Sequence, residues 1–260
     1  MVNVIVKTHN LQELVRKVHL DGLINNAVIQ FKDNRMKIEA IGIEDKEGII
    51  DNTLTIDVNY PCETVEGGLL GIGDLGAFLH GLEQFERDDV IQISSTETVI
   101  TVTRASPLMS IDFEAADVKF IKTYAMGLKV IFGTTIKIVR ADGKEKLFAF
   151  DSSITVDAQK LKQHGATISS IPDVKNMQII VKDGKLSAEA KGTYKVKRDL
   201  EGITTITGNA EEIYSKDIFA ILKTGIGVAT LKFSKASPIH ISYVHESMTA
   251  DYLLQAWDGR

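Results

Sequence analysis

The chain has 260 residues, of which 44% are hydrophobic and 25% charged, and its mean hydropathy is +0.02. This composition indicates a globular protein with a sizeable core and excludes the disordered classes. The net charge is -5 and the sequence pI is about 5.7. A protein that binds nucleic acid through its bulk charge is therefore disfavoured, because such domains usually have a pI above roughly 9. Any basic surface must be local.

The single cysteine, Cys62, excludes an internal disulfide and is typical of a reducing compartment. No apolar run approaches the roughly 20 residues that span a bilayer. The segment 1–10 lacks the basic, apolar and small-residue order of a signal peptide. We therefore expect an intracellular protein that does not interact with membranes.

Apolar and polar residues alternate with a period of two through most of the chain, which predicts short antiparallel strands. The predicted strands include residues 4–6, 27–31, 36–40, 54–58, 90–94, 99–103, 128–132, 135–139, 177–181, 185–190, 203–207, 228–233 and 239–244. Asp183-Gly184 and Asp142-Gly143 each lie between two such runs and indicate hairpin turns.

Four short helices are predicted where apolar residues fall at helical spacing. They follow the capping residues Asn10, Asp74, Asp157 and Ser215. The first two caps are 64 residues apart and the last two are 58 apart, which indicates a duplication with extra residues inserted at the middle. The predicted fold class is a duplicated α+β protein whose helices pack together on one face of antiparallel sheet.

The same pattern predicts the domain boundaries. We expect an N-terminal domain over residues 1–117, a long connector over 118–152 and a C-terminal domain over 153–260. The connector carries alternating runs at 129–139 and 146–150, which could form an extra hairpin around residues 141–144. It is therefore not a plain flexible linker, which would be rich in Gly, Ser or Pro.

The sequence carries no convincing catalytic or cofactor signature. Gly71 to Gly76 matches G-x-G-x-x-G, but the run before it is a poor buried strand, so a helix entry capped by Asp74 is the favoured interpretation. The six histidines lack the spacing of a metal site. His240 and Ser242 share one face of a predicted strand, which is too little for a nucleophile and its base. We expect no metal, no cofactor and no enzymatic activity, although an enzyme with a dispersed site stays open.

Basic residues lie on the polar faces of three of the four predicted helices. They are Arg16 and Lys17 on the first helix, Lys160 and Lys162 on the third, and Lys216 and Lys223 on the fourth. The second helix exposes Ala77, His80 and Gln84 and has no charge on this face. In an acidic protein, this distribution predicts a local surface for a polyanion.

Two runs near the C-terminus, 231–243 (LKFSKASPIHISY) and 250–257 (ADYLLQAW), resemble the C-terminal strands of the proliferating cell nuclear antigen (PCNA) family of DNA sliding clamps. Residues 11–56 resemble the first helix, hairpin and third strand of that family, and residues 74–117 resemble its second helix and following strands. The resemblance covers nearly the whole chain, through the order and spacing of elements. It implies a clamp fold with sheets outside and helices on the inner face.

The resemblance also implies a function. Clamps of this family are trimeric rings that encircle duplex DNA without sequence preference, act as polymerase processivity factors, and tether replication and repair proteins. Double-stranded DNA, a DNA polymerase, a clamp loader and proteins with clamp-binding peptides would be the partners, and the homotrimer is the favoured state. The protein would lie with the DNA, in the cytoplasm or nucleoid of an archaeon or a virus-infected cell, or in the nucleus of a eukaryote. A heterotrimer subunit and a monomeric factor that binds DNA by charge stay open.

Site residues follow from the resemblance by position. The six basic residues above would face DNA. The subunit interface would pair residues 108–114 with 193–198 through Met109, Ile111, Phe113, Tyr194 and Val196. The partner-peptide pocket would include Ile41, Ile43, Pro238, Leu253, Ala256 and Trp257. The connector is about twice the usual length, so none of its residues is assigned to the pocket, and this departure favours a divergent archaeal or viral clamp.

Overall fold

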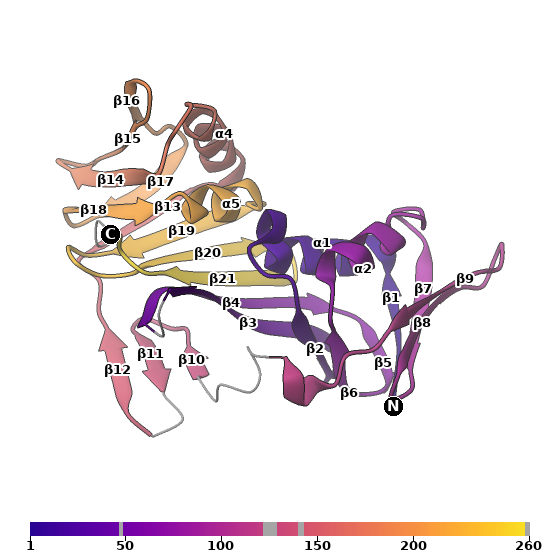
Figure 1. Cartoon of the computed structure of the whole chain (residues 1–260). Coiled ribbons are helices and arrows are strands. Elements are labelled where there is room, and N and C mark those ends of the chain that lie inside the picture. The colour runs from indigo at the N-terminus through magenta and orange to yellow at the C-terminus, as the bar shows by residue number, and fades with distance from the viewer. Residues whose placement is uncertain (47–48, 122–128, 140–142, 258–260) are drawn as a thin grey trace. The chain divides into compact units, whose positions relative to one another are not determined.

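The structure is a computed structural model that describes residues 1–46, 49–121, 129–139 and 143–257, with the side chains of 41–46, 49–55 and 129 not included. It divides into two compact units (Figure 1). The first comprises Met1–Ile41, Ile56–Gly127 and Ser247–Thr249, and the second comprises Gly42–Thr55, Leu128–Glu246 and Ala250–Arg260.

The N-terminal half of the chain begins with a strand and a helix, and apart from Gly42–Thr55 it belongs to the first unit. Its elements are β1 (Val2–Lys7), α1 (Thr8–His19), the 3-10 turn η1 (Leu20–Gly22), β2 (Ala27–Lys32), β3 (Arg35–Lys46), β4 (Ile49–Pro61), β5 (Glu63–Glu66), β6 (Gly68–Ile72), α2 (Leu75–Leu82), β7 (Val90–Ser95), β8 (Val99–Arg104), β9 (Met109–Glu114) and η2 (Val118–Phe120). Neighbouring strands follow the orders β5-β1-β7-β8-β9 and β4-β3-β2-β6.

The second unit carries three connector strands and then repeats the plan of the first. The connector strands are β10 (Lys129–Ile131), β11 (Ile136–Val139) and β12 (Glu145–Phe148). The repeated elements are β13 (Ser152–Asp157), α4 (Ala158–Ser169), β14 (Asn176–Lys182), β15 (Lys185–Lys191), β16 (Lys195–Asp199), β17 (Ile203–Thr207), β18 (Ala210–Ser215), α5 (Asp217–Lys223), β19 (Val228–Phe233), β20 (Ile239–His245) and β21 (Met248–Leu254).

The strand orders establish the duplication. The orders β17-β13-β19-β20-β21 and β16-β15-β14-β18 in the second unit repeat β5-β1-β7-β8-β9 and β4-β3-β2-β6 in the first, strand for strand. Neighbouring strands pair antiparallel in equivalent registers, as in Val4 with Ile93 and the equivalent Ile154 with Leu231. The prediction of a duplicated α+β fold with four short helices is therefore confirmed for the residues that the structure describes.

Each unit packs its pair of helices together (Figure 1). In the first unit, the Gln12 side-chain amide of α1 donates a buried hydrogen bond to the carbonyl oxygen of Leu82 at the end of α2, at 2.9 Å. In the second, Gly165 of α4 lies so close to Leu222 of α5 that an added Cβ would meet the Leu222 Cβ at 2.9 Å. The apolar sides of these helices cover strand residues such as Val4, which is fully buried. Burying one such side chain stabilises the fold by roughly 1.5–3 kcal/mol.

Two of the four predicted helix caps are correct. The Asp74 carboxylate accepts from the backbone N–H of Ala77 at 2.8 Å, and Asp157 accepts from that of Lys160 at 3.0 Å. The prediction at Asn10 is wrong, because α1 begins at Thr8, directly after β1, with Lys7 in the cap position and no capping side chain. Ser215 is the last residue of β18 and Lys216 occupies the cap position of α5.

The connector holds more structure than the predicted hairpin. Its strands β10, β11 and β12 form a three-stranded antiparallel sheet, with Val130 opposite Ile138 and Ile136 opposite Phe148. Gly143 has a positive φ of 78°, as the predicted turn requires, whereas Ala141 and Asp142 lie outside the described residues. The three strands belong to the second compact unit.

Candidate functional site

The helix surface of the second unit carries four exposed lysines that the sequence predicted. Lys160 and Lys162 on α4 and Lys216 at the start of α5 are all exposed. Helix α4 contains no acidic residue, and α5 contains only Asp217, which accepts a hydrogen bond from the Ser215 hydroxyl at 3.1 Å. Lys223 is exposed as well. The helix pair α4 and α5 therefore presents ammonium groups with few nearby carboxylates.

The helix surface of the first unit differs from the prediction. The side chain of Lys17 is fully buried, so its placement on an exposed polar face is wrong. Helix α1 buries a wider stripe than its leucines and valines alone define, since Gln12 and Lys17 are buried with them. Arg16 is exposed, but its guanidinium is paired with Glu83 at 2.9 Å and with Glu13 at 3.5 Å. The first unit thus offers one basic side chain of the predicted pair, and that one is partly neutralised.

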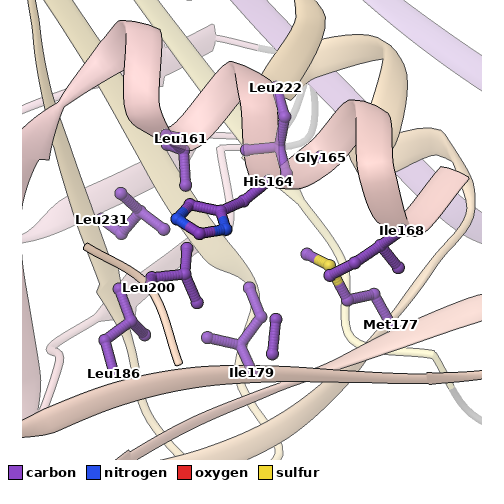
Figure 2. Close-up of a pocket in the computed structure, with 11 residues that line it drawn as sticks. Leu161, His164, Gly165, Ile168, Met177, Ile179, Leu186, Leu200, Leu222 and Leu231 are labelled. Atoms are coloured by element: carbon purple, nitrogen blue, oxygen red, sulfur yellow. The ribbon is translucent and has the colours of Figure 1, made fainter. Parts of the chain in front are cut away.

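A buried histidine of α4 points into the core of the second unit. His164 lines a small apolar cavity with Leu161, Ile168, Met177 and Leu231 among others (Figure 2). Its Nε2 accepts a hydrogen bond from the backbone N–H of Glu201 at 3.2 Å, whereas its Nδ1 is buried without a partner among the described atoms. Burial lowers the pKa of His164, the charges of Arg198 and Lys160 add to this, and Glu201 opposes it. The imidazole is therefore held neutral as part of the core.

The predicted interface strands are both edge strands. In the described part of the chain, β9 pairs with β8 alone and β16 with β15 alone. On β9, Ile111 and Phe113 lie opposite Val102 and Ile100, which are fully buried, yet Ile111 and Phe113 are only half-buried. The apolar face of this sheet therefore extends to the edge strand β9, where the helices of the unit cover it only in part.

The second edge has the same character and the opposite charge. Val196 of β16 is half-buried opposite the buried Ala190, and Tyr194, just before the strand, is 53% exposed. The other face of β16 carries Lys195, Lys197 and, at its end, Asp199, whereas the other face of β9 carries Asp112 and Glu114. The two free edges thus combine half-covered apolar residues with charges of opposite sign.

The predicted peptide-pocket residues are placed in three different ways. Pro238 and Leu253 are buried, Leu253 within a cluster that includes connector side chains. Ala256 and Trp257 are half-buried and lie beside β18, where Ala256 bridges Tyr214 and the Trp257 N–H donates to the carbonyl of Ile213 at 2.8 Å. Ile41 and Ile43 lie on β3, and their side chains are outside the description.

The connector supplies residues that the sequence interpretation left unassigned. Ile136, Ile138 and Phe148 are buried against Leu253, with Val130, Phe132 and Phe150 packed around them. The rings of Phe132 and Phe150 also lie 5.3 and 6.4 Å from the ring of His240. Their alternation along β10 to β12 is the sequence signal that could have identified them, but it gave no indication of the surface on which they pack.

The glycine-rich segment has a structural explanation. β6 pairs antiparallel with β2, so Gly71 does not follow the parallel strand of a dinucleotide-binding unit. A Cβ at Gly71 would lie 2.2 Å from the Ala116 carbonyl oxygen, so the close approach of the chain after β9 requires glycine there. Asp74 then caps α2, as predicted.

The residues that the structure describes contain no group of three or more His, Cys, Asp or Glu side chains arranged to hold a metal ion. Among their helices, none is long and apolar enough to cross a membrane.

Comparisons with known proteins identify the fold. No protein-family model matches the chain, and no curated protein matches it. Among solved structures, the A. fulgidus PCNA with the C-terminal region of FEN-1 bound is 16% identical with a TM-score of 0.73, and all of both chains is covered. PCNA from Entamoeba histolytica is 11% identical with a TM-score of 0.73, and a PCNA2–PCNA3 complex from Sulfolobus tokodaii is 16% identical with a TM-score of 0.70, each with 98% of both chains covered. The chain therefore has the duplicated fold of the PCNA sliding clamps along its whole length.

Proposed function

We propose that this protein is a DNA sliding clamp: a ring of identical chains that encircles duplex DNA and tethers replication and repair proteins to it. One observation carries the proposal. A chain with the clamp fold throughout ends two of its sheets in free edges, β9 and β16, whose apolar faces are half-covered and whose charges are opposite. Exposed sheet edges are normally protected, and pairing one edge with the other on the next copy would protect both.

The charges favour a second copy of this chain as the partner on each edge. Asp112 and Glu114 on β9 would meet Lys195 and Lys197 on β16 of the neighbouring copy. Because the two edges differ, each contact is head-to-tail, and such contacts close into a ring when the rotation between copies allows it. The solved neighbour that is a PCNA2–PCNA3 complex makes assembly with a different clamp subunit the alternative.

The DNA-facing surface would be formed by the helices. Lys160, Lys162 and Lys216 are exposed and lie on helices with few carboxylates, which suits loose contacts to phosphates. Such contacts carry no base information, and enclosure of the duplex supplies the persistence. We assign the protein no catalytic role. By analogy with the FEN-1 region bound to the A. fulgidus protein, partners would bind through short peptides.

Light scattering across a dilution series tests the assembly. We expect a species near three times 28.6 kDa that dissociates on dilution. A strict monomer at all concentrations would contradict the self-assembling ring. If added cell extract then restored a larger species, that result would indicate a heteromer.

Retention on DNA tests encirclement. Subunits are reassembled by concentration in the presence of a linear duplex whose ends are then blocked by streptavidin, and retention at high salt is compared with that on the same duplex with free ends. We expect retention only with blocked ends. The triple variant Lys160→Glu, Lys162→Glu, Lys216→Glu should lower retention, whereas the matched variant Lys182→Glu, Lys185→Glu, Lys235→Glu, all exposed and off the helices, should not. Equal retention on free and blocked ends would contradict enclosure.

A further inference from the structure

The face of the second unit's sheet that points away from its helices is covered at β20 and β21. On these strands, Tyr243 and Tyr252 point to the helix side, where the Tyr243 hydroxyl donates to the Ile221 carbonyl of α5 at 3.3 Å. Residues of opposite parity, His240 and Leu253, therefore lie on the other face. That face of an antiparallel sheet is commonly solvated. Here, however, His240 is 4% and Leu253 1% exposed.

The cover is the connector's own three-stranded sheet. Ile136, Ile138 and Phe148 pack on Leu253, and the rings of Phe132 and Phe150 lie against His240. The connector thus fills this face with aromatic and branched aliphatic side chains.

The fit between cover and face is incomplete at His240. Its Nε2 lies 2.8 Å from an Asp251 carboxylate oxygen, and in this pairing Nε2 carries the hydrogen because the carboxylate oxygen accepts it. The second ring nitrogen, Nδ1, is buried without a partner among the described atoms. An apolar cover leaves this acceptor unsatisfied, whereas a peptide main chain would bring an N–H to it.

The connector sheet depends on its apolar face for stability. Its strands have only three, four and four residues, and a sheet of three short strands is stable through its hydrophobic face. Its apolar side chains on the Leu253 face supply that packing. Loss of this one contact would therefore release the connector without unfolding the strands beneath it.

We propose that the connector sheet is a competitive lid over the partner-peptide site on His240 and Leu253. An incoming peptide with aromatic and branched aliphatic side chains displaces β10 to β12, packs on Leu253 and donates a main-chain N–H to Nδ1 of His240. This inference rests on the proposed function, since it concerns how a clamp would admit its partners.

Four single variants separate the lid from the site. Phe148→Ser weakens only the connector side of the contact, and Leu147→Ser is its matched control, since Leu147 is the preceding residue of β12 and is 66% exposed. Leu253→Ser removes the sheet side of the contact, and Ile138→Ser repeats the connector test at a second position. The probe is a synthetic peptide with the FEN-1 C-terminal sequence found on the A. fulgidus clamp. Its affinity is measured by calorimetry, and connector opening by hydrogen exchange of the β11 and β12 amides.

If the connector is a lid, variants on the two sides of this contact should change the peptide affinity in opposite directions. Phe148→Ser and Ile138→Ser should speed exchange and tighten peptide binding about tenfold, because a larger fraction of molecules is open. Leu253→Ser should also speed exchange but weaken binding about tenfold, and Leu147→Ser should change neither.

The lid is overturned if Phe148→Ser speeds exchange without tightening binding, if it weakens binding, or if no variant binds the peptide. The mass and DNA-retention measurements are made on the same variants. A trimer that is retained on blocked DNA but fails the peptide test loses the lid and keeps the proposed function, whereas a monomer without retention loses the proposed function.

Discussion

Phe113, on the edge strand β9, packs edge-to-face on Phe78 of helix α2, with ring centroids 4.8 Å apart and planes at 65°. The contact exists because residue 81, one turn further along α2, is glycine: a Cβ there would lie 2.4 Å from the Phe113 Cζ. Phe113, which we propose to lie at the subunit interface, is therefore also part of the first unit's core. A loss of assembly in Phe113→Ala would mix these two roles.

Gly81→Ala tests this relationship. Alanine favours a helix over glycine by about 1 kcal/mol, but the clash with the Phe113 ring should outweigh it and leave a net destabilisation of about 1–2 kcal/mol. The check is urea unfolding of Gly81→Ala in the wild-type and Phe113→Leu backgrounds. The loss should shrink in the second background, and an equal loss in both would place its origin elsewhere.

Glu83→Gln tests whether the ion pair with Arg16 restrains DNA contact. Both side chains are more than 40% exposed, so the pair contributes little to stability, about 0–1 kcal/mol. Removing the Glu83 carboxylate leaves the Arg16 guanidinium with only its longer pairing to Glu13, at 3.5 Å, so a phosphate can compete for it. Duplex DNA binding at low salt should then tighten about two- to threefold. The measurement is fluorescence anisotropy across a salt series.

Glu86→Gln is the matched control for that variant. Glu86 is exposed, follows α2 in the same segment and changes the net charge equally. It should change affinity less than Glu83→Gln does. Equal gains from both would mean that only the overall charge matters.

Local patterns predicted most of the fold because its elements depend on short-range chemistry. Alternation located the strands and the capping aspartates located α2 and α4. The start of α1 was missed because Lys7 has no capping side chain, so the helix begins where β1 ends and its start is set by packing. Lys17 was misplaced for a similar reason, since helical periodicity assigns a lysine to the surface and only tertiary packing buries it.

The connector cluster lay beyond prediction for a different reason. Its alternating residues indicated strands, but contact with Leu253 and His240 joins residues about 90 to 120 positions apart, and neither composition nor period encodes such a pairing. The edge strands β9 and β16 were easier to place, because the resemblance supplied their positions and the strand alternation supplied their apolar residues. Their pairing between copies stays a prediction.

His164 predicts a pH dependence of stability. Burial, with the charges of Arg198 and Lys160, lowers its pKa in the folded state, and its Nε2 must stay unprotonated to accept from the Glu201 N–H. The unfolded chain therefore binds a proton that the folded chain excludes once the pH falls below about 6.5. This contribution is complete above that pH and is lost as the pH falls towards the folded pKa, by up to about 1.4 kcal/mol per pH unit.

The check is urea unfolding between pH 7.5 and 5 for the wild type, His164→Gln and His245→Gln. His245 is exposed and serves as the control. His164→Gln should flatten the acid side of the stability curve, and His245→Gln should not. Curves of the same slope for wild type and His164→Gln would refute this assignment.

Charge reversal at the two free edges tests the head-to-tail contact most directly. Asp112→Lys with Glu114→Lys puts two basic edges on each chain, and Lys195→Glu with Lys197→Glu puts two acidic edges on each chain. Either pair of changes should weaken self-association at least tenfold at low salt, because like charges then face each other, and the effect should shrink as salt screens them. The quadruple variant restores opposite charges and should recover assembly by light scattering. Lys195 already has an ion pair with Glu189 at 2.5 Å, so Lys197→Glu alone should have the larger single effect. A quadruple variant that stays as weak as its parents would show that β9 and β16 do not meet.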